Sequence, residues 1–246
     1  MTERRLERSP LVAAIERRSF LRQGLSLGAL TLLSGCDISD DDAVQSVLRA
    51  MSNWNDRAQA LLFGSGALAQ TYPDSAVTRD FPFTSYFPPD KVPQLKAADY
   101  RLELSGLIEN KRPWTVEDLH AMPQESQVTR HVCVEGWSAI GKWGGARLGH
   151  FLQRIGADLT AKYVGFQCAD GYTGSLDMAT ALHPQTIMAF TFADEEIPAR
   201  FGYPFKVRIP TKLGFKNPKW VTTLFVTNRR PNGFWEDRGY NWFSGI

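Results

Sequence analysis

Residues 130–138 decide how the rest of this chain is interpreted, and they are Arg130-His131-Val132-Cys133-Val134-Glu135-Gly136-Trp137-Ser138. The alternating side chains up to Cys133 predict a strand, and Gly136 predicts a turn directly after it. Cys133 is one of three cysteines in the chain. Because a thiolate is a soft ligand, Cys133 is a candidate to bind a metal. The alternative is a structural disulfide between Cys133 and Cys168, which an oxidising compartment would favour.

The overall charge of the chain is misleading. The 246 residues have a formal net charge of +2, but the first 35 hold six of the 28 basic and three of the 26 acidic residues. From Cys36 onward, 22 basic residues stand against 23 acidic ones, so this part is near neutral. A near-neutral protein offers no electrostatic argument for nucleic-acid binding. The length suits one large domain or two small ones.

The N-terminal residues have the pattern of an export signal. A twin-arginine sequence, Arg17-Arg18-Ser19-Phe20-Leu21-Arg22, is followed by the apolar run Gly24–Leu33. That run is shorter than the roughly 20 residues that span a bilayer, so it predicts export rather than a transmembrane anchor. Twin-arginine export carries folded proteins, often with a cofactor inserted, and therefore hints at a cofactor. The alternative is a basic amphipathic helix.

A lipid-attachment pattern ends this apolar run. The sequence Leu33-Ser34-Gly35-Cys36 predicts cleavage before Cys36 and lipidation of its thiol, with an ordinary signal peptide cleaved nearby as the alternative. Asp37 follows, which in enteric-type bacteria favours retention at the periplasmic face of the inner membrane. The expected organisation is a signal peptide over 1–35, a tether and lead-in over 36–74, and one domain over 75–246.

The rest of the chain predicts short strands with short helices between them. Ala43–Leu62 has loose helical spacing, and the proline- and aromatic-rich Phe81–Pro93 predicts an extended loop. Strands are expected at Tyr100–Ser105, Gln127–Cys133, Lys162–Cys168, Phe205–Ile209 and Trp220–Thr227. Short helices are expected over Val116–Ala121 with Thr115 as cap, over Leu148–Ile155 before Gly156, and from a Ser175 cap to Leu182. This order indicates an α+β domain with mixed sheets.

The segment from Ile197 to Trp235 has charges of one sign. It has no acidic residue and eight basic ones: Arg200, Lys206, Arg208, Lys212, Lys216, Lys219, Arg229 and Arg230. Such a bias within a near-neutral protein indicates an anion-binding site, and its positive field would keep a nearby thiol ionised. The alternative is a solvated basic face.

Seven short motifs follow one another along the chain. They are Cys133-Val-Glu-Gly-Trp-Ser138, Lys142-Trp-Gly-Gly145, Tyr163-Val-Gly-Phe166, Asp170-Gly-Tyr172, Ala181-Leu-His-Pro184, Gly202-Tyr-Pro204 and Pro210-Thr-Lys-Leu-Gly-Phe-Lys216. In this order they resemble the molybdopterin-binding oxidoreductase domain of the sulfite oxidase family, over about residues 75–246. The resemblance implies an α+β fold that is mostly β, with mixed sheets and peripheral helices. It also implies one bound molybdenum–pyranopterin, Mo-molybdopterin.

The resemblance further implies a set of cofactor-binding residues. It makes Cys133 the molybdenum ligand. The pterin-binding positions of the bacterial branch fall on Thr84, Phe87, Pro88, Cys168, Phe201, Lys206, Asn217, Pro218 and Lys219. Cys168 would then belong to the cofactor pocket instead of a disulfide. Lys206 and Lys219 suit a terminal phosphate as point charges.

Three positions bear on the substrate. The family commonly has asparagine where this chain has Thr84, so that hydrogen bond is altered. Phe83 stands where animal and plant sulfite oxidases have an arginine that helps to hold sulfite, so sulfite itself is not implied. Tyr172 corresponds to a tyrosine that lines the family's substrate pocket, where its phenol can donate a hydrogen bond to an oxo group. The alternative for Tyr172 is a half-buried structural role.

His131 raises the alternative of a zinc site. On a strand, His131 and Cys133 point to the same face, but a closed zinc site needs four ligands. No ligand-like spacing is found for His120, His150 or His183. A pocket or core histidine is therefore the preferred interpretation. Glu135 and Asp170 are candidate proton relays, with turn or capping roles as the alternative.

The implied protein is an exported molybdenum oxidoreductase that transfers an oxygen atom to or from a small substrate: an S-oxide, an N-oxide or a sulfur compound. The sequence has no Cys-x-x-Cys-His haem motif, so electrons are expected to come from or go to a separate protein. The resemblance implies a membrane or periplasmic cytochrome. The aromatic stretch Phe234–Phe243 either packs on the fold or forms a partner surface. The rival function is a non-catalytic periplasmic lipoprotein, a binding module with a Cys133–Cys168 disulfide.

Overall fold

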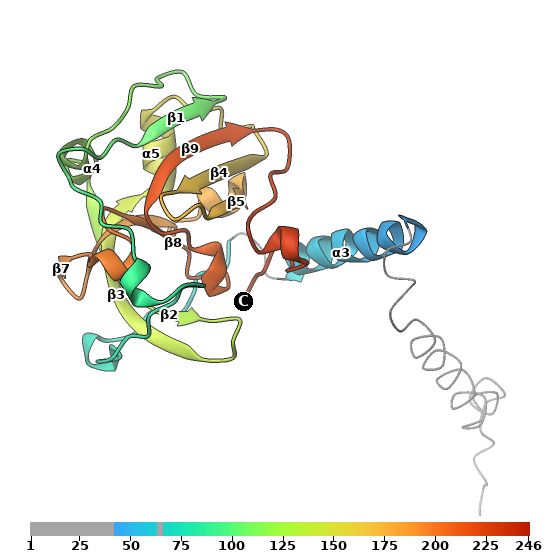
Figure 1. Cartoon of the computed structure of the whole chain (residues 1–246), viewed down its shortest axis with the longest axis horizontal. Coiled ribbons are helices and arrows are strands. Elements are labelled where there is room, and N and C mark those ends of the chain that lie inside the picture. Colours follow the sequence, from blue (N-terminus) through green and yellow to red (C-terminus); the bar gives the residue numbers. More distant parts are fainter. Residues whose placement is uncertain (1–41, 63–65) are drawn as a thin grey trace, which may run out of the picture. The chain divides into compact units, whose positions relative to one another are not determined.

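The computed structural model describes residues 42–62 and 66–246. The predicted twin-arginine segment and the predicted lipid attachment at Cys36 lie outside the described residues. The chain divides into two compact units, Met1–Trp54 and Asn55–Ile246, and the second contains both β-sheets (Figure 1). In the part that the structure describes, no helix is both long and apolar enough to cross a bilayer.

The first sheet has four strands in the order β1-β9-β4-β5. They are β1 (Glu103–Gly106), β9 (Val221–Thr227), β4 (Tyr163–Cys168) and β5 (Thr173–Asp177). β1 pairs with β9 in parallel, whereas β9, β4 and β5 pair antiparallel. The sheet is therefore mixed, as expected for an α+β domain.

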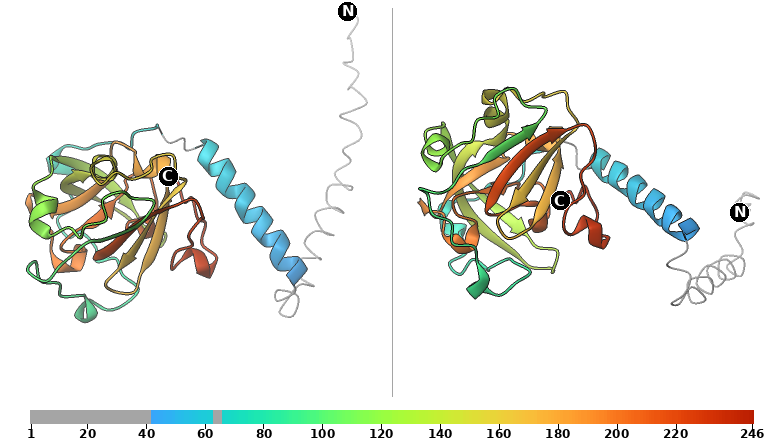
Figure 2. Two further views of the ribbon diagram at one scale, coloured as in Figure 1. Left: turned by 90° about the horizontal axis from the view of Figure 1, so that it is seen from above. Right: turned by 45° about the horizontal axis from the view of Figure 1, so that its top comes forward.

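The second sheet has five strands, with β2, β3, β6 and β7 in line and β8 paired to β6. They are β2 (Gln124–Val132), β3 (Ser138–Arg147), β6 (Ile187–Phe192), β7 (Glu195–Glu196) and β8 (Lys206–Arg208). All its pairings are antiparallel. Figure 2 shows both sheets from two further sides.

Short helices connect and flank the strands. The α-helices are α3 (Asp42–Leu62), α4 (Val116–His120), α5 (Leu148–Arg154) and α6 (Met178–Ala181). The 3₁₀ turns are η1 (Asp74–Ala76), η2 (Pro89–Lys91), η3 (Ala199–Phe201), η4 (Gly214–Lys216) and η5 (Glu236–Arg238). The main hydrophobic core joins side chains of both sheets to α4 and α5. This shared core fixes the loops at the strand ends relative to one another.

The Trp-Gly-Gly motif has a steric reason. The pairing of β3 with β6 shifts its register between Gly144 and Gly145. A Cβ at Gly145 would lie 1.8 Å from the carbonyl oxygen of Met188, and one at Gly144 would lie 2.3 Å from the hydroxyl of Thr191. The backbone contact at Gly145 therefore requires glycine for the strands to approach this closely, whereas a side chain at Gly144 would first displace the hydroxyl of Thr191.

Several predicted elements are confirmed. Thr115 caps α4 in a capping box with Asp118, and α5 ends before Gly156, which has a φ of +64°. The strands expected at 127–133, 162–168 and 220–227 correspond to β2, β4 and β9 within a few residues. The helix expected at 43–62 is α3. Local periodicity and capping chemistry were sufficient for these elements.

Other expectations were wrong or incomplete. Ser175 caps no helix, because it lies inside β5, and Asp177 caps α6 by accepting a hydrogen bond from the N–H of Thr180. β3, β5, β6 and β7 were not predicted, since a glycine-rich strand, short strands and a two-residue strand have no distinctive period. The alternating strand at 205–209 exists as β8, but its polar side chains are not solvated: Lys206 is 2% exposed and Arg208 0%.

Candidate functional site

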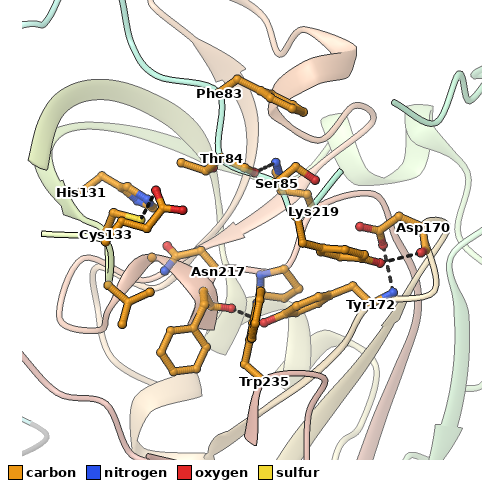
Figure 3. Close-up of a pocket in the computed structure, with 16 residues that line it drawn as sticks. Phe83, Thr84, Ser85, His131, Cys133, Asp170, Tyr172, Asn217, Lys219 and Trp235 are labelled. Carbon is orange, nitrogen blue, oxygen red and sulfur yellow. Dashed lines mark hydrogen bonds between the residues drawn. The ribbon is translucent and has the colours of Figure 1, made fainter. Parts of the chain in front are cut away.

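A pocket lies where the end of β2 meets four other segments of the chain. These are the loop around Thr84, the β4–β5 turn, the loop after β8 and the tail at Trp235. Figure 3 shows Cys133 and His131 on one side of the pocket and Asp170 and Tyr172 on the other. Segments from residues 83 to 235 thus contribute to one cavity, which only the packing of the two sheets brings together.

The turn after β2 presents Cys133 to the pocket. The N–H of Cys133 donates to the carbonyl of Trp137, and the N–H of Gly136 donates to the carbonyl of Cys133. Gly136 has a φ of +92°, which explains the glycine at this position. The turn therefore fixes the backbone of Cys133, while its half-buried side chain lines the cavity.

The surroundings of Cys133 raise the pKa of its thiol instead of lowering it. Burial raises its pKa, and the carboxylate of Glu135, which lies 3.7 Å from its sulfur, acts in the same direction, whereas the backbone N–H groups of Glu135 and Val134 lower the pKa. The expectation that the basic segment would keep this thiol ionised was therefore wrong for the protein without a bound metal. The charged group that contacts the sulfur of Cys133 is the carboxylate of Glu135, and a metal must displace the thiol proton when it binds.

Three basic side chains lie close together at the pocket, and we call Lys206, Arg208 and Lys219 the cation cluster. Lys219 lines the pocket, whereas Lys206 and Arg208 do not. A Cβ at Gly202 would lie 3.1 Å from the Cβ of Lys206 and 3.0 Å from that of Lys219. Among residues 42–62 and 66–246, no acidic group forms an ion pair with any of the three. Buried cations without counter-charges are costly, so the cluster is suited to an anionic ligand.

Burial dominates the electrostatics of the cation cluster, although the charge of Asp170 partly offsets the effect of burial on the pKa of Lys219. Burial, followed by repulsion from Lys219 and Arg208, lowers the pKa of Lys206 well below its usual range. Burial lowers the pKa of Lys219 to about 7 and that of Arg208 to about 9. The Nζ of Lys219 donates to the carbonyl of Thr84 and lies 4.9 Å from the ring of Phe83. Lys219 thereby ties the aromatic loop to the strand β9.

Arg208 connects β8 to the strand that ends at Cys133. Its guanidinium donates to the side-chain oxygen of Asn217 at 3.1 Å, to the hydroxyl of Thr129 at 3.1 Å and to the carbonyl of Arg130 at 2.6 Å. The same Asn217 oxygen accepts a hydrogen bond from the N–H of Ile209. Arg208 therefore positions the loop after β8 against β2. The sequence showed it only as one of eight basic residues.

His131 is a neutral, buried histidine that lines the pocket. Burial, and then repulsion from Lys206 and Arg208, holds its pKa well below the usual range. It is 1% exposed, and neither ring nitrogen has a hydrogen-bond partner within the described residues. A Cβ at Gly214 would lie 2.4 Å from Nε2, so the Gly-Phe-Lys motif leaves room for this ring. The preferred interpretation, a pocket or core histidine, agrees with this placement.

The aromatic side of the pocket includes the C-terminal tail. Tyr172 is 7% exposed, and its hydroxyl donates to the carbonyl of Phe215 at 2.5 Å. The hydroxyl proton of Tyr172 is therefore already engaged in a hydrogen bond, although the hydroxyl oxygen can still accept one. Phe234 stacks on Tyr86 with ring centroids 4.5 Å apart, and Trp235 lines the cavity. This part of the tail packs on the fold and completes the pocket wall.

Asp170 is the second carboxylate of the pocket. It accepts a hydrogen bond from the N–H of Tyr172, which is a turn role, and burial raises its pKa. A carboxyl group with a raised pKa holds its proton to higher pH, which also suits a proton relay. Both interpretations of Asp170 therefore remain compatible with its geometry.

The structure brings together only part of the predicted site. Thr84, Cys133, Tyr172, Asn217, Pro218 and Lys219 line the pocket, whereas five other predicted residues do not: Phe87, Pro88, Cys168, Phe201 and Lys206. Phe87 packs near Trp220, and Phe201 packs among Phe81, Trp143 and Phe192 in the smaller core. Pro88 is exposed, at the start of η2. Their roles toward a cofactor stay predictions.

The two rival sites find no support in the described residues. Cys133 and Cys168 are both free thiols, so the binding module with a Cys133–Cys168 disulfide is not what this structure contains. Cys168 is buried at the end of β4, where the backbone N–H of Lys219 bonds to its sulfur. Within residues 42–62 and 66–246, no three histidine, cysteine or acidic side chains gather as metal ligands would in a zinc site.

The lowered pKa of Lys219 predicts how stability depends on pH. In the cofactor-free protein, Lys219 loses its proton near pH 7 when folded, but only near pH 10.5 when unfolded. Between these values the unfolded chain binds more protons, so the free energy of unfolding rises with pH, by up to about 1.4 kcal/mol per pH unit. Urea unfolding at a series of pH values should show this rise, and Lys219→Met should reduce its slope. If the free energy of unfolding of Lys219→Met rises with pH as steeply as that of the unaltered chain, Lys219 is not the source of this pH dependence.

Comparisons with known proteins show what this chain is similar to. Residues 90–235 match the family model of the oxidoreductase molybdopterin binding domain. The chain is 56% identical over 229 residues to the putative protein-methionine-sulfoxide reductase subunit YedZ1 of Azospira oryzae, covering 93% of this chain and 87% of that protein. The same comparison places it at 26% identity over 171 residues to the protein-methionine-sulfoxide reductase catalytic subunit MsrP of Ralstonia nicotianae, covering 62% of this chain and 52% of that protein.

More distant relatives extend the similarity. The chain is 30% identical over 181 residues to the mitochondrial sulfite oxidase of Drosophila melanogaster, covering 62% of this chain and 31% of that protein. It thus spans about half of the MsrP protein and a third of the sulfite oxidase. The sulfane dehydrogenase SoxCD of Paracoccus pantotrophus superposes with a TM-score of 0.53 at 22% identity, covering 56% of this chain and 40% of that one. That likeness supports the fold alone.

Proposed function

Because the chain belongs to the family of oxidoreductase molybdopterin-binding domains, with relatives among the sulfite oxidases and methionine sulfoxide reductases, we propose that it removes the oxygen atom from S-oxides. Methionine sulfoxide is the first candidate substrate, since the relative with 56% identity is named for it. The observation that carries the proposal is a pocket lined by both the thiol of Cys133 and the ammonium of Lys219, with Lys206 close enough to Lys219 and Arg208 to be repelled by both.

The residues present fit a Mo-molybdopterin. Cys133 offers a thiol at the pocket wall for molybdenum, and the cation cluster offers charges that need an anion such as a phosphate. The unpartnered ring nitrogens of His131 add polar atoms that await a ligand or water. Thr84, Phe87, Pro88, Cys168, Phe201, Lys206 and the run Asn217–Lys219 would surround the pterin. When bound, the cofactor supplies a metal that changes oxidation state as an oxygen atom is transferred.

The chain's own groups supply protons and exclude water. Reduction of a sulfoxide consumes two electrons and two protons and yields a thioether and water. Glu135 and Asp170 are the two carboxyl groups that line the pocket. The raised pKa of Asp170 lets its carboxyl group hold a proton at the pocket wall. Tyr86, Phe234 and Trp235 enclose the side of the pocket that carries Tyr172. An apolar enclosure of this kind suits the methyl and methylene groups of a thioether.

Electrons must reach the pocket from another protein, for which a membrane or periplasmic cytochrome is proposed, because the sequence has no haem-attachment motif. The proposed location is the periplasm, with the chain attached to the inner membrane by a lipid on Cys36. The twin-arginine and lipid-attachment patterns support this location. Mass spectrometry of the exported protein tests it by detecting an acylated Cys36.

A substrate screen tests the proposed reaction. The protein, produced in a host that makes molybdopterin, should oxidise reduced benzyl viologen with methionine sulfoxide or dimethyl sulfoxide. With sulfite and an electron acceptor, it should be at least about tenfold slower, since Phe83 offers no charge to the anion. Trimethylamine N-oxide is tested as a further substrate, to distinguish the reduction of S-oxides from the reduction of N-oxides. A faster reaction with sulfite than with any S-oxide would overturn the proposed direction.

A further inference from the structure

A buried ion pair joins the loop after β8 to the C-terminal tail. The ammonium of Lys216 lies 2.5 Å from a carboxylate oxygen of Glu236, and the two side chains are 2% and 4% exposed. Lys216 ends η4 and Glu236 begins η5, so the pair links two short turns that are 20 positions apart. Burial costs both charges their hydration, so a buried ion pair is weak evidence for stability. The role of this pair is therefore best judged from the residues that it holds in place.

Each partner of this ion pair follows a residue of the pocket wall. Phe215 precedes Lys216, Trp235 precedes Glu236, and both aromatic side chains line the pocket. The carbonyl of Phe215 also accepts the hydrogen bond from the hydroxyl of Tyr172 (Figure 3). The ion pair therefore fixes two parts of the wall relative to each other, one in the loop after β8 and one in the tail.

Other aromatic rings support the ring of Trp235. Its centroid lies 5.0 Å from that of Tyr240, 5.2 Å from that of Phe234 and 6.4 Å from that of Tyr86. The N–H of Phe234 donates to the carbonyl of Thr173, which attaches this end of the tail to β5. Trp235 is thus a large apolar surface that three neighbouring rings hold at the pocket.

The walls of the pocket differ in polarity. The carboxylate of Glu135 and the buried ring of His131 lie on the side of Cys133, whereas Phe215 and Trp235 present aromatic carbon. An S-oxide is divided in the same way, since its sulfur carries one polar oxygen and two carbon substituents. The oxygen suits the side of Cys133, and an apolar substituent suits the aromatic side.

We propose that Trp235 is a specificity-determining residue that contacts a bulky apolar substituent of the S-oxide, and that the Lys216–Glu236 ion pair positions it. This inference rests on the proposed function, because it takes S-oxides as the substrates. The match to the family model ends at residue 235, so Glu236 receives no role from that match. The expected consequence is a preference for aryl sulfoxides over dimethyl sulfoxide that is expressed in KM more than in kcat.

Two S-oxides that differ in one substituent test the role of Trp235. Methyl phenyl sulfoxide has a ring in place of one methyl group of dimethyl sulfoxide. In the molybdenum-loaded protein with reduced benzyl viologen, Trp235→Leu should lower kcat/KM for methyl phenyl sulfoxide about five- to tenfold through a higher KM, because an aromatic contact is lost. The kcat/KM for dimethyl sulfoxide, which has no ring to make that contact, should change less than about twofold.

Variants at the ion pair test the positioning role. Glu236→Gln leaves the ammonium of Lys216 without its ion-pair partner, and the double variant Lys216→Met with Glu236→Met removes both charges. Each should raise the KM for methyl phenyl sulfoxide at least about threefold and change kcat less than about twofold, because the wall is displaced and Cys133 is not. The double variant should keep the urea midpoint near that of the unaltered chain, so it decides the matter if the single variant unfolds. Glu125→Gln is the matched control, because it breaks an exposed ion pair with Arg147 and should leave both constants unchanged.

Ligand binding without turnover separates this inference from the proposed function. Equilibrium dialysis measures the Kd of methyl phenyl sulfone, which has the same ring and one more oxygen, for the molybdenum-loaded protein. Trp235→Leu should raise this Kd about fivefold. That rise in a protein that reduces no S-oxide would refute the proposed reaction and show that the apolar contact with Trp235 still exists.

The opposite results would overturn the inference and leave the proposed function standing. They are equal losses of kcat/KM for the two sulfoxides in Trp235→Leu, and a Kd for the sulfone that is the same with and without Trp235. Failure of the unaltered chain to bind the sulfone would also overturn it. An unchanged KM in the double variant would show that the ion pair does not position Trp235.

Discussion

Cys133→Ser is expected to reduce molybdenum in the purified protein to background and to lower sulfoxide reduction by more than about 100-fold. The reason is that loss of a residue that only supports a metal ligand already costs about 10- to 100-fold, and Cys133 would be the ligand itself. Elemental analysis per chain gives the metal content, and the reduced-viologen assay gives the activity.

The fold should survive this substitution. Cys133 is half-buried, and its backbone is held by hydrogen bonds in the β2–β3 turn that serine can keep. The urea midpoint of the cofactor-free variant should therefore stay near that of the unaltered cofactor-free chain. Full molybdenum content in Cys133→Ser would refute the ligand assignment, and unfolding of the variant would be visible in the midpoint.

Lys206→Met is expected to have opposite effects on the cofactor-free and the cofactor-bound protein. Lys206 is 2% exposed, repelled by Lys219 and Arg208, and without an ion-pair partner among the described residues. Replacing such a cation with an apolar side chain should raise the free energy of unfolding of the cofactor-free chain by about 1–3 kcal/mol. Loss of a charged contact to the phosphate should weaken cofactor retention by about 10- to 100-fold.

A surface lysine provides the matched control for this pair of measurements. Lys142 forms ion pairs with Asp74 at 2.6 Å and Asp194 at 2.7 Å. Lys142→Met should therefore lower the stability of the cofactor-free chain by at most about 1 kcal/mol and leave molybdenum content unchanged. If Lys206→Met retains the cofactor as well as the unaltered chain, Lys206 is a structural cation and has no contact with the phosphate.

The local elements were the most predictable part of the fold. Thr115 and Asp118 lie three residues apart, so a capping box could be inferred from spacing alone and was found. β4 and β9 were predicted because their apolar residues alternate. β3 was missed because Gly141, Gly144 and Gly145 interrupt any period, although the close approach to Met188 requires one of these glycines.

The chemical types at the site were predictable, but their environment was not. The sequence predicted that Cys133 ends a strand and that the basic residues after Ile197 gather. It did not predict that the carboxylate of Glu135 would contact the sulfur, or that Arg208 would link β8 to β2. Thr129 and Arg208 are 79 positions apart, and no local pattern encodes such a contact.

The sequence by itself determined the residue chemistry and the local backbone: a thiol before a glycine turn, a run of cations without acids, and an amphipathic helix. The tertiary structure alone decided which of these groups lose water and which charges they face. Desolvation and Coulomb interactions depend on distances between segments far apart in the chain, and these set the pKa of Cys133 and Lys219.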